Sequence, residues 1–354
     1  MPDVITALDQ LTPERLSEIL YTNGHLSGEE VTRVTVSSEY TTPPSIIAHV
    51  HLTFSGDTAA PDRLLLKIPK PDTLPADPRE VMYYNVLADS MFASPSVPCY
   101  DAVYDDASGT CHILLKDVSD THGTVPWPLS PGRRHAEQII DALAALHGYC
   151  WNDPRIGSDL LGALPSMQLI TDPADVSLKF PHFVDFMGER LSTERRRLFE
   201  TVFAIWPDLF NARISGHENL TIIHRDAHAQ NILLPHDSRE APAYLIDWQT
   251  YQPWISAQDL AYHFTLFWYP EQRSLMELDL LKLYYSRLLE HGVPDYDWDA
   301  FWYDYRLSVI RCLYVPAIHG GNPDTAWLWW PQLQKVVSAF QDLDCRELLA
   351  SHRL

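Results

Sequence analysis

The sequence reads IHRDAHAQN at residues 223–231 and YLIDWQ at residues 244–249, and these two stretches carry most of its information. Asp226 and Asn231 stand on the polar connection between two short apolar runs, and Asp247 ends a third run. If the second and third runs pair antiparallel, these three side chains converge. Oxygen ligands such as Asn231 and Asp247 suit Mg²⁺ that also binds phosphate oxygens. Asp226 would then orient a substrate hydroxyl and accept its proton.

The same residues match a known catalytic-loop pattern, H-x-D-x-x-x-x-N, at His224, Asp226 and Asn231. The chain thereby resembles the kinase superfamily, and more closely its small-molecule branch of aminoglycoside phosphotransferases, choline kinases and ecdysteroid-kinase-like proteins. His228 falls where that branch often carries a histidine, and Asp247, followed by Trp and Gln, is similar to its metal-binding aspartate. Residues 259–262 and 142–147 also resemble segments of this branch.

The resemblance implies an α+β, bilobal, protein-kinase-like fold with a small β-rich N-terminal lobe and a larger, mainly helical C-terminal lobe. Residues 1–115 would form the nucleotide-binding lobe, and residues 116–354 would form the catalytic and acceptor-binding lobe. The implied cofactors are ATP and Mg²⁺, bound between the lobes. We therefore expect an ATP- and Mg²⁺-dependent phosphotransferase that acts on a hydroxyl group of a small molecule, such as a metabolite, an antibiotic or a steroid-like alcohol.

The resemblance also assigns roles to individual residues. Asp226 would be the catalytic residue, and Asn231 and Asp247 would hold the metal. The residues expected to bind the nucleotide are Lys67, Glu80 and, in the interlobe hinge, Lys116 and Val118. His224 is expected to brace the loop backbone rather than to act as a base.

Lys67 is a notable lysine because the chain has only six, and this one lies inside the apolar run 63–68. A buried, unpaired lysine is costly, so it needs a partner. The resemblance implies that Glu80, on the following helix, is that partner. Arg79 and Lys70 are nearby alternatives for either role. The simpler interpretation is that Lys67 is a solvated lysine on an edge strand.

Periodicity divides the chain into a β-rich part and a helical part. A helix is expected to begin at Pro13 and another to cover residues 78–87. Expected strands cover residues 34–36, 46–54, 63–68, 97–104 and 112–116. Residues 120–131 form a loop, a helix follows at 135–150, and helices dominate afterwards, with short strand-like runs at 221–223, 231–234 and 243–246.

One segment departs from the kinase pattern. Residues 36–45, where a glycine-rich loop would cover the phosphates, contain no glycine. Glycine allows close backbone approach to a phosphate and positive φ. Its absence weakens the nucleotide assignment, or the hydroxyl groups of Ser37, Ser38, Thr41 and Thr42 cover the phosphates instead.

Composition limits the partners. The chain carries 47 acidic and 26 basic side chains, a formal charge of −21, which argues against nucleic acid as a partner. We also expect no secretory signal, no membrane span and a cytoplasmic location. The five scattered cysteines suggest neither disulfides nor zinc. Only 12 positions separate Asp247 from Asp259, too few for a peptide-docking activation segment, so no protein substrate is expected.

The acceptor is expected to be a small molecule, either cationic or hydrophobic. Residues 295–305 combine aromatic and acidic side chains, and residues 327–330 contain three tryptophans. Aromatic faces with carboxylates suit a cationic amine, and aromatic faces alone suit a flat hydrophobic acceptor. A core aromatic stripe with a solvated acidic face is the simpler interpretation.

Three alternatives stay open. Asp226 and Asn231 could merely satisfy backbone groups in a turn. The chain could be a kinase-fold nucleotide or metabolite sensor that has lost efficient transfer. A metal-dependent hydrolase using His224, Asp226 and His228 ranks last, since the sequence lacks the usual spacing of metal ligands.

Overall fold

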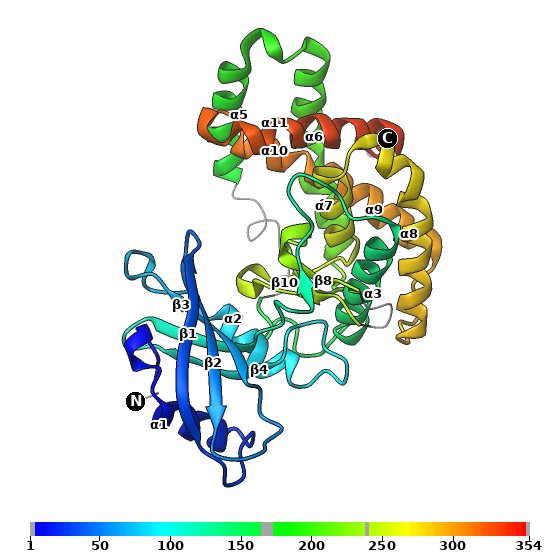
Figure 1. Ribbon diagram of the computed structural model, residues 1–354. Helices are drawn as coiled ribbons and strands as arrows, with labels where there is room; N and C mark the ends of the chain where they lie inside the picture. Colours follow the sequence, from blue (N-terminus) through cyan, green and yellow to red (C-terminus); the bar gives the residue numbers. More distant parts are fainter. Residues whose placement is uncertain (1–3, 164–172, 238–240, 352–354) are drawn as a thin grey trace. The chain divides into compact units, whose positions relative to one another are not determined.

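The chain divides into two units in the computed structural model, which describes residues 4–163, 173–237 and 241–351 (Figure 1). Unit 1 comprises Met1–Gly123 and Pro235–Thr250, and unit 2 comprises Thr124–Leu234 and Tyr251–Leu354. Each unit is therefore built from two separate stretches of chain. Unit 1 is β-rich and unit 2 is mainly helical, as the periodicity predicts.

Unit 1 contains a five-stranded antiparallel sheet with the order β1-β2-β3-β5-β4. Its strands are β1 (Val31–Thr41), β2 (Ser45–Phe54), β3 (Arg63–Pro69), β4 (Cys99–Asp105) and β5 (Thr110–Lys116). The central strand β3 alternates between its faces: Leu64, Leu66 and Ile68 are buried in the core. Because successive side chains of a strand point to opposite faces, Lys67 lies on the other face.

Helices cover parts of this sheet. Helix α1 (Pro13–Thr22) begins where its sequence predicts, since the Thr12 Oγ1 atom accepts a hydrogen bond from the Arg15 N–H at 3.2 Å. Its buried residues Leu16 and Leu20 join the core of the sheet. The expected helix at 78–87 is present as α2 (Arg79–Met82), but it widens into a π-helical segment, Tyr83–Ala88. That segment buries Tyr83, Tyr84 and Leu87.

The glycine-free segment forms a β-hairpin. Strand β1 continues to Thr41 and β2 begins at Ser45, with no positive φ angle from residue 36 to residue 45. Two of its hydroxyl groups bond within the hairpin: Ser37 Oγ donates to the His49 carbonyl oxygen, and Thr42 Oγ1 accepts from the Ser45 N–H at 3.1 Å. This conformation therefore does not require glycine.

Unit 2 is organised around α7 (Ala257–Phe267), most of whose residues are buried. Helix α7 packs against α8 (Pro270–Glu290), α9 (Trp298–Cys312) and α11 (Ala326–Asp342). The remaining described helices are α3 (Arg133–Tyr149), α5 (Pro173–Met187), α6 (Thr193–Ile214), α10 (Tyr314–His319) and α12 (Arg346–Ser351). Figure 1 shows α10 and α11 close to α5 and α6 at one end of the unit.

Short strands interrupt these helices. In unit 2, β7 (Thr221–Ile223) pairs antiparallel with β10 (Gln252–Trp254). Strand β8 (Ile232–Pro235) follows the 3₁₀ turn Ala229–Asn231, and unit 1 contains β6 (His122–Gly123) and β9 (Tyr244–Leu245). The H-x-D-x-x-x-x-N pattern thus begins at His224, directly after β7, and Asp247 follows β9.

The acidic aromatic stretch 295–305 belongs mostly to the core. Phe301 and Tyr305 are fully buried in α9, while Asp297 and Asp299 are exposed, as the simpler interpretation predicts. Asp304 differs, because it is buried and paired with Arg213 at 2.6 Å. This stretch therefore contributes packing rather than an open acceptor surface.

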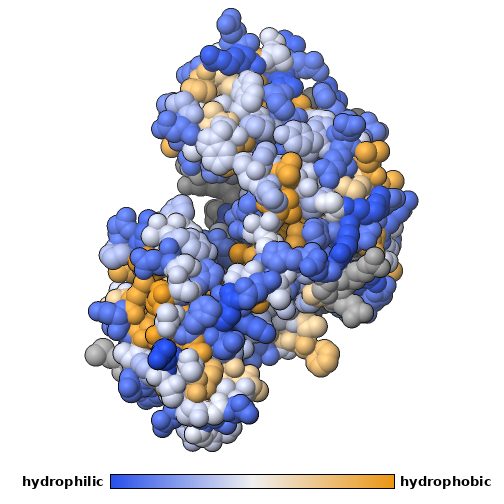
Figure 2. Space-filling view, viewed as in Figure 1, coloured by the Kyte–Doolittle hydropathy of each residue, from blue (hydrophilic) through white to orange (hydrophobic). Residues whose placement is uncertain are grey.

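Figure 2 shows hydrophilic residues over most of the face in view, with separate apolar patches on it. Among the described residues, no helix combines the length and apolar character that crossing a bilayer requires.

Candidate active site

Lys67 is the centre of an ion-pair cluster in unit 1. Its Nζ atom lies 2.6 Å from Glu80 Oε2 and 2.8 Å from Asp247 Oδ1. The three residues come from β3, α2 and the turn after β9. The ion pair between Lys67 and Glu80 that the resemblance implies is thus present, and Arg79 instead pairs with Asp77.

The charges in this cluster stabilise one another. Burial alone would lower the pKa of Lys67, but attraction to Glu80 and Asp247 outweighs it and raises that pKa above the usual value for lysine. Lys67 is therefore a permanent cation. The side chain of Asp247 is 32% exposed against 8% for Glu80, so Asp247 is the carboxylate that a ligand can reach.

The turn that carries Asp247 is fixed by an aromatic stack. Asp247 has φ of 68°, a left-handed conformation that aspartate tolerates better than most residues. The next residue, Trp248, lies on Tyr83 with ring centroids 3.6 Å apart and planes 8° apart, and both rings are fully buried. The Trp248 indole N–H also donates to the Leu245 carbonyl oxygen at 3.1 Å. Because Tyr83 follows α2, the helix that carries Glu80 also supports the Asp247 turn.

The expected hinge residues lie at the end of β5. Lys116 is exposed at the last position of the strand, and its N–H donates to the Pro98 carbonyl oxygen at 2.9 Å. The Val118 carbonyl oxygen accepts from the N–H groups of Thr121 and His122. Between them, Asp117 is held by His49 and Arg63. A role for Lys116 and Val118 in nucleotide binding stays a prediction.

Asp226 is the centre of a second cluster, in unit 2. Its Oδ1 atom accepts a hydrogen bond from the Tyr262 hydroxyl at 2.8 Å, and its Oδ2 atom accepts one from Asn231 Nδ2 at 3.0 Å. His228 Nε2 lies 3.5 Å from the same Oδ2 atom. Burial would raise the pKa of Asp226, but hydrogen bonds from His228 and Tyr262 outweigh it and lower that pKa to about 2. Asp226 is therefore ionised at neutral pH.

A buried aspartate on α7 holds the loop that carries Asp226. Asp259 accepts hydrogen bonds from the backbone N–H groups of His224, at 2.6 Å, and Arg225, at 2.8 Å. His147 Nε2 lies 3.2 Å from Asp259, and both side chains are fully buried. Arg225 has φ of 72°, a strained conformation that these contacts hold in place.

The two histidines of the loop have local roles. The Asp226 N–H donates to His224 Nδ1 at 3.3 Å, which agrees with the expectation that His224 braces the backbone. His228 caps the following 3₁₀ turn, since its Nδ1 atom accepts a hydrogen bond from the Gln230 N–H at 3.2 Å. His228 also has its other ring nitrogen near Asp226.

The chemistry of Asn231 and Asp247 fits a magnesium ion. Asn231 donates to Asp226 through Nδ2, so its Oδ1 atom is the branch of the amide that a cation would bind. Asp247 uses Oδ1 to bind Lys67, and its partial exposure makes the other carboxylate oxygen the candidate ligand. Amide and carboxylate oxygens are the ligands that Mg²⁺ prefers. Asn231 belongs to unit 2 and Asp247 to unit 1.

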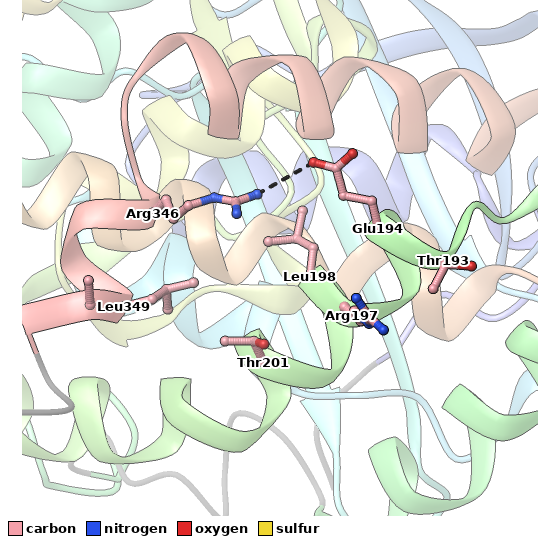
Figure 3. Close-up of a pocket in the computed structure, with 8 residues that line it drawn as sticks. Thr193, Glu194, Arg197, Leu198, Thr201, Arg346 and Leu349 are labelled. Atoms are coloured by element: carbon pink, nitrogen blue, oxygen red, sulfur yellow. Dashed lines mark ion pairs between the residues drawn. The ribbon is translucent and has the colours of Figure 1, made fainter.

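A separate pocket of about 670 Å³ lies in unit 2 between the start of α6 and α12 (Figure 3). Figure 3 shows Arg346 and Glu194 facing one another, and their charged atoms are 3.8 Å apart. Both side chains are well exposed, so this ion pair contributes little. None of the predicted site residues lines this pocket.

Three residues of these clusters have no role predicted from the sequence: Tyr262, Tyr83 and His147. Their contacts join residues 36, 165 and 112 positions apart, at Tyr262–Asp226, Tyr83–Trp248 and His147–Asp259. Tyr262 and His147 lie in the segments 259–262 and 142–147 that resemble the family, and this resemblance is the signal that could have drawn attention to them.

Comparison with known proteins places these clusters in context. Residues 51–302 match the model of the phosphotransferase enzyme family. A search of curated proteins found no match. The solved structure of a microcompartment-associated aminopropanol kinase superposes with a TM-score of 0.58 at 10% identity, covering 96% of this chain and 98% of that one. A Plasmodium vivax ethanolamine kinase gives 0.50 at 13% identity, covering 86% and 83%. These similarities confirm the predicted protein-kinase-like α+β fold.

Proposed function

This chain belongs to the phosphotransferase enzyme family, and we propose that it transfers the γ-phosphoryl group of ATP to a hydroxyl group of a small molecule. The observation that carries the proposal is the cluster of Lys67, Glu80 and Asp247, built from three distant parts of the sequence. A cation held between two carboxylates, one of them partly exposed, is the arrangement that phosphate and metal binding require.

The proposed reaction is an in-line displacement. The acceptor hydroxyl oxygen forms a bond to the γ-phosphorus while the bond from that phosphorus to the β–γ bridging oxygen breaks, and ADP leaves. The hydroxyl proton passes to Asp226, whose pKa of about 2 keeps it ionised and able to orient the hydroxyl group. Such a low pKa makes Asp226 a weak base, so positioning supplies most of its contribution.

The remaining residues bind the nucleotide and the metal. Lys67, positioned by Glu80, neutralises phosphate charge, and Lys116 and Val118 contribute to nucleotide binding from the hinge. Asn231 and Asp247 would hold Mg²⁺, which when bound supplies positive charge against the phosphate oxygens. In this proposal residues 1–115 form the nucleotide-binding lobe and residues 116–354 form the catalytic and acceptor-binding lobe.

Two variants test the proposal. Asp226→Ala should abolish phosphoryl transfer, measured as ATP consumption over a panel of alcohols, amino alcohols and sugars, while calorimetry finds nearly unchanged ATP binding. Asp247→Ala should instead remove the Mg²⁺ dependence of ATP binding. Asp299→Ala and Asp106→Ala, which alter exposed aspartates in units 2 and 1, are the matched controls. Wild-type transfer by Asp226→Ala would overturn the mechanism, and binding without turnover for any acceptor would identify a sensor.

A further inference from the structure

Two tryptophans of unit 2 stand out because their rings are exposed. Trp127 is 42% exposed and Trp327 is 63% exposed, whereas five other tryptophans are at most 2% exposed. The two indoles meet edge to face, with centroids 5.8 Å apart and planes at 86°. They form a corner of two perpendicular apolar faces, here called the tryptophan corner. Keeping such large apolar surfaces in water forgoes the stabilisation that burial would give.

Ring contacts connect the tryptophan corner to the proposed catalytic residue. Trp127 contacts Phe267 at 6.1 Å between centroids. Phe267 in turn contacts both His228 and Tyr262 at 5.3 Å. These last two residues are the ones that approach the Asp226 carboxylate, at 3.5 Å and 2.8 Å. A series of ring contacts therefore leads from the carboxylate to the corner; Phe267 within it is only 8% exposed, and the two tryptophans form its exposed surface.

This surface offers few polar partners to a ligand. The Tyr262 hydroxyl already donates to Asp226, and His228 Nδ1 already accepts from the Gln230 N–H. Phe267 and the two indole faces are apolar. A sugar bound here would leave several hydroxyl groups without hydrogen bonds, which is costly in a desolvated site. The surface therefore favours an apolar molecular body.

The nearby charges favour a neutral ligand. Lys335 donates from Nζ to the Phe267 carbonyl oxygen at 2.7 Å and lies over the Tyr269 ring, 4.6 Å from its centroid. Burial lowers the pKa of Lys335 to about 8, so it is mainly protonated at neutral pH and disfavours a cationic ligand beside Phe267. The ionised Asp226 disfavours an anionic one.

We propose that the tryptophan corner is the acceptor subsite, and that it takes a neutral alcohol carried by a flat apolar ring system, with the hydroxyl directed toward Asp226. This inference rests on the proposed function, because it assumes that an acceptor hydroxyl approaches Asp226. It adds the chemical class of the acceptor and two residues that select it.

The experiment measures binding separately from turnover. Calorimetric titration of the full chain with 2-naphthylmethanol, in the presence of Mg²⁺ and ADP, should detect binding to the wild type. Trp127→Ala and Trp327→Ala should each weaken it about tenfold, the expected effect of losing one aromatic contact. Trp330→Ala is the matched control, since Trp330 is also exposed on α11 and its ring contacts Trp329 instead. Trp327→Phe should retain most of the affinity.

Each outcome decides the proposal. Equal affinities for Trp127→Ala and Trp330→Ala, no binding of 2-naphthylmethanol by the wild type, or tighter binding of choline or glucose would overturn it. Melting curves identify any variant that fails to fold, in which case the relative affinities of the wild type for 2-naphthylmethanol, choline and glucose decide the proposal. Full transfer activity in Asp226→Ala would overturn the proposed function instead, and it would leave the binding result unchanged.

Discussion

Unit 1 holds its predicted phosphate-binding side chains by charge, whereas unit 2 holds its predicted catalytic loop by hydrogen bonds to the backbone. Lys67 is fixed between the carboxylates of Glu80 and Asp247. The loop of Asp226 is fixed by Asp259, which accepts from two consecutive N–H groups. A charge cluster remains sensitive to a ligand that brings its own charges, while a backbone clamp does not depend on the ligand. We therefore expect substitutions in unit 2 to act on chemistry and those in unit 1 to act mainly on nucleotide binding.

The largest effect is expected for Asp259→Asn. An amide NH₂ in place of one carboxylate oxygen would face the N–H group of either His224 or Arg225, because each binds a different oxygen, and that buried donor would be left unsatisfied. We expect about 3 kcal/mol lower stability and a loss of roughly 100-fold or more in kcat through misplacement of Asp226. Chemical denaturation and steady-state kinetics measure the two quantities. Asp299→Asn, on the exposed face of α9, should match the wild type. An unchanged kcat in Asp259→Asn would show that the clamp does not position Asp226.

The next effect is expected for Lys67→Met, which leaves Glu80 and Asp247 facing each other without a cation. We expect kcat/KM for MgATP to fall by about 10- to 100-fold. The double variant Lys67→Met/Glu80→Leu removes a buried partner as well, so it should recover stability without recovering activity. Recovery of both would mean that the cluster serves folding alone.

A smaller effect is expected for Tyr83→Leu, which removes the stack on Trp248 and loosens the turn of Asp247. We expect the Mg²⁺ concentration for half-maximal activity to rise about 3- to 10-fold, with kcat at saturating Mg²⁺ little changed. Tyr83→Phe keeps the ring and should behave as the wild type. An equal change in both variants would assign the effect to the hydroxyl group rather than to the stack.

The smallest effect at neutral pH is expected for Tyr262→Phe. Asp226 is active when ionised, so activity is lost as the pH falls through its pKa of about 2. Loss of the Tyr262 hydroxyl should raise that pKa and move the acid limb of the pH profile of kcat/KM upward. At pH 7.5 the carboxylate stays ionised, and kcat should change by no more than about 3-fold. A larger loss at pH 7.5 with an unmoved acid limb would contradict this assignment.

The two regions were not equally predictable from the sequence. The predicted catalytic-loop residues lie within nine positions, and the preceding histidine, the apolar runs on both sides and Asp247 beyond them together identify the pattern. A lysine in an apolar strand demands a partner, and the family resemblance implied that Glu80 is the partner of Lys67. Short apolar or alternating runs located the strands of the sheet, but β1 extends from Val31 to Thr41, well beyond the predicted 34–36. The helix start at Pro13 follows from its cap.

Other contacts could not be read from the sequence, because they depend on how distant elements pack. The stack of Trp248 on Tyr83 joins residues 165 positions apart, and the π-helical turn that places Tyr83 has no local signal. The sequence identified Asp259 only as part of the segment 259–262 that resembles the family. Its contact with two backbone N–H groups depends on the folded chain. The tryptophan corner joins a loop to a helix 200 positions later.

The division of the chain between the units has a consequence for biosynthesis. Unit 1 contains Pro235–Thr250 in addition to its N-terminal stretch, and Asp247 belongs to that later segment. Domains generally fold as they emerge from the ribosome. A nascent chain halted before residue 235 can pair Lys67 with Glu80 but lacks Asp247 and Trp248. The predicted phosphate-binding cluster is therefore completed only after the predicted catalytic loop has been synthesised, so no early fragment of this protein carries the whole cluster.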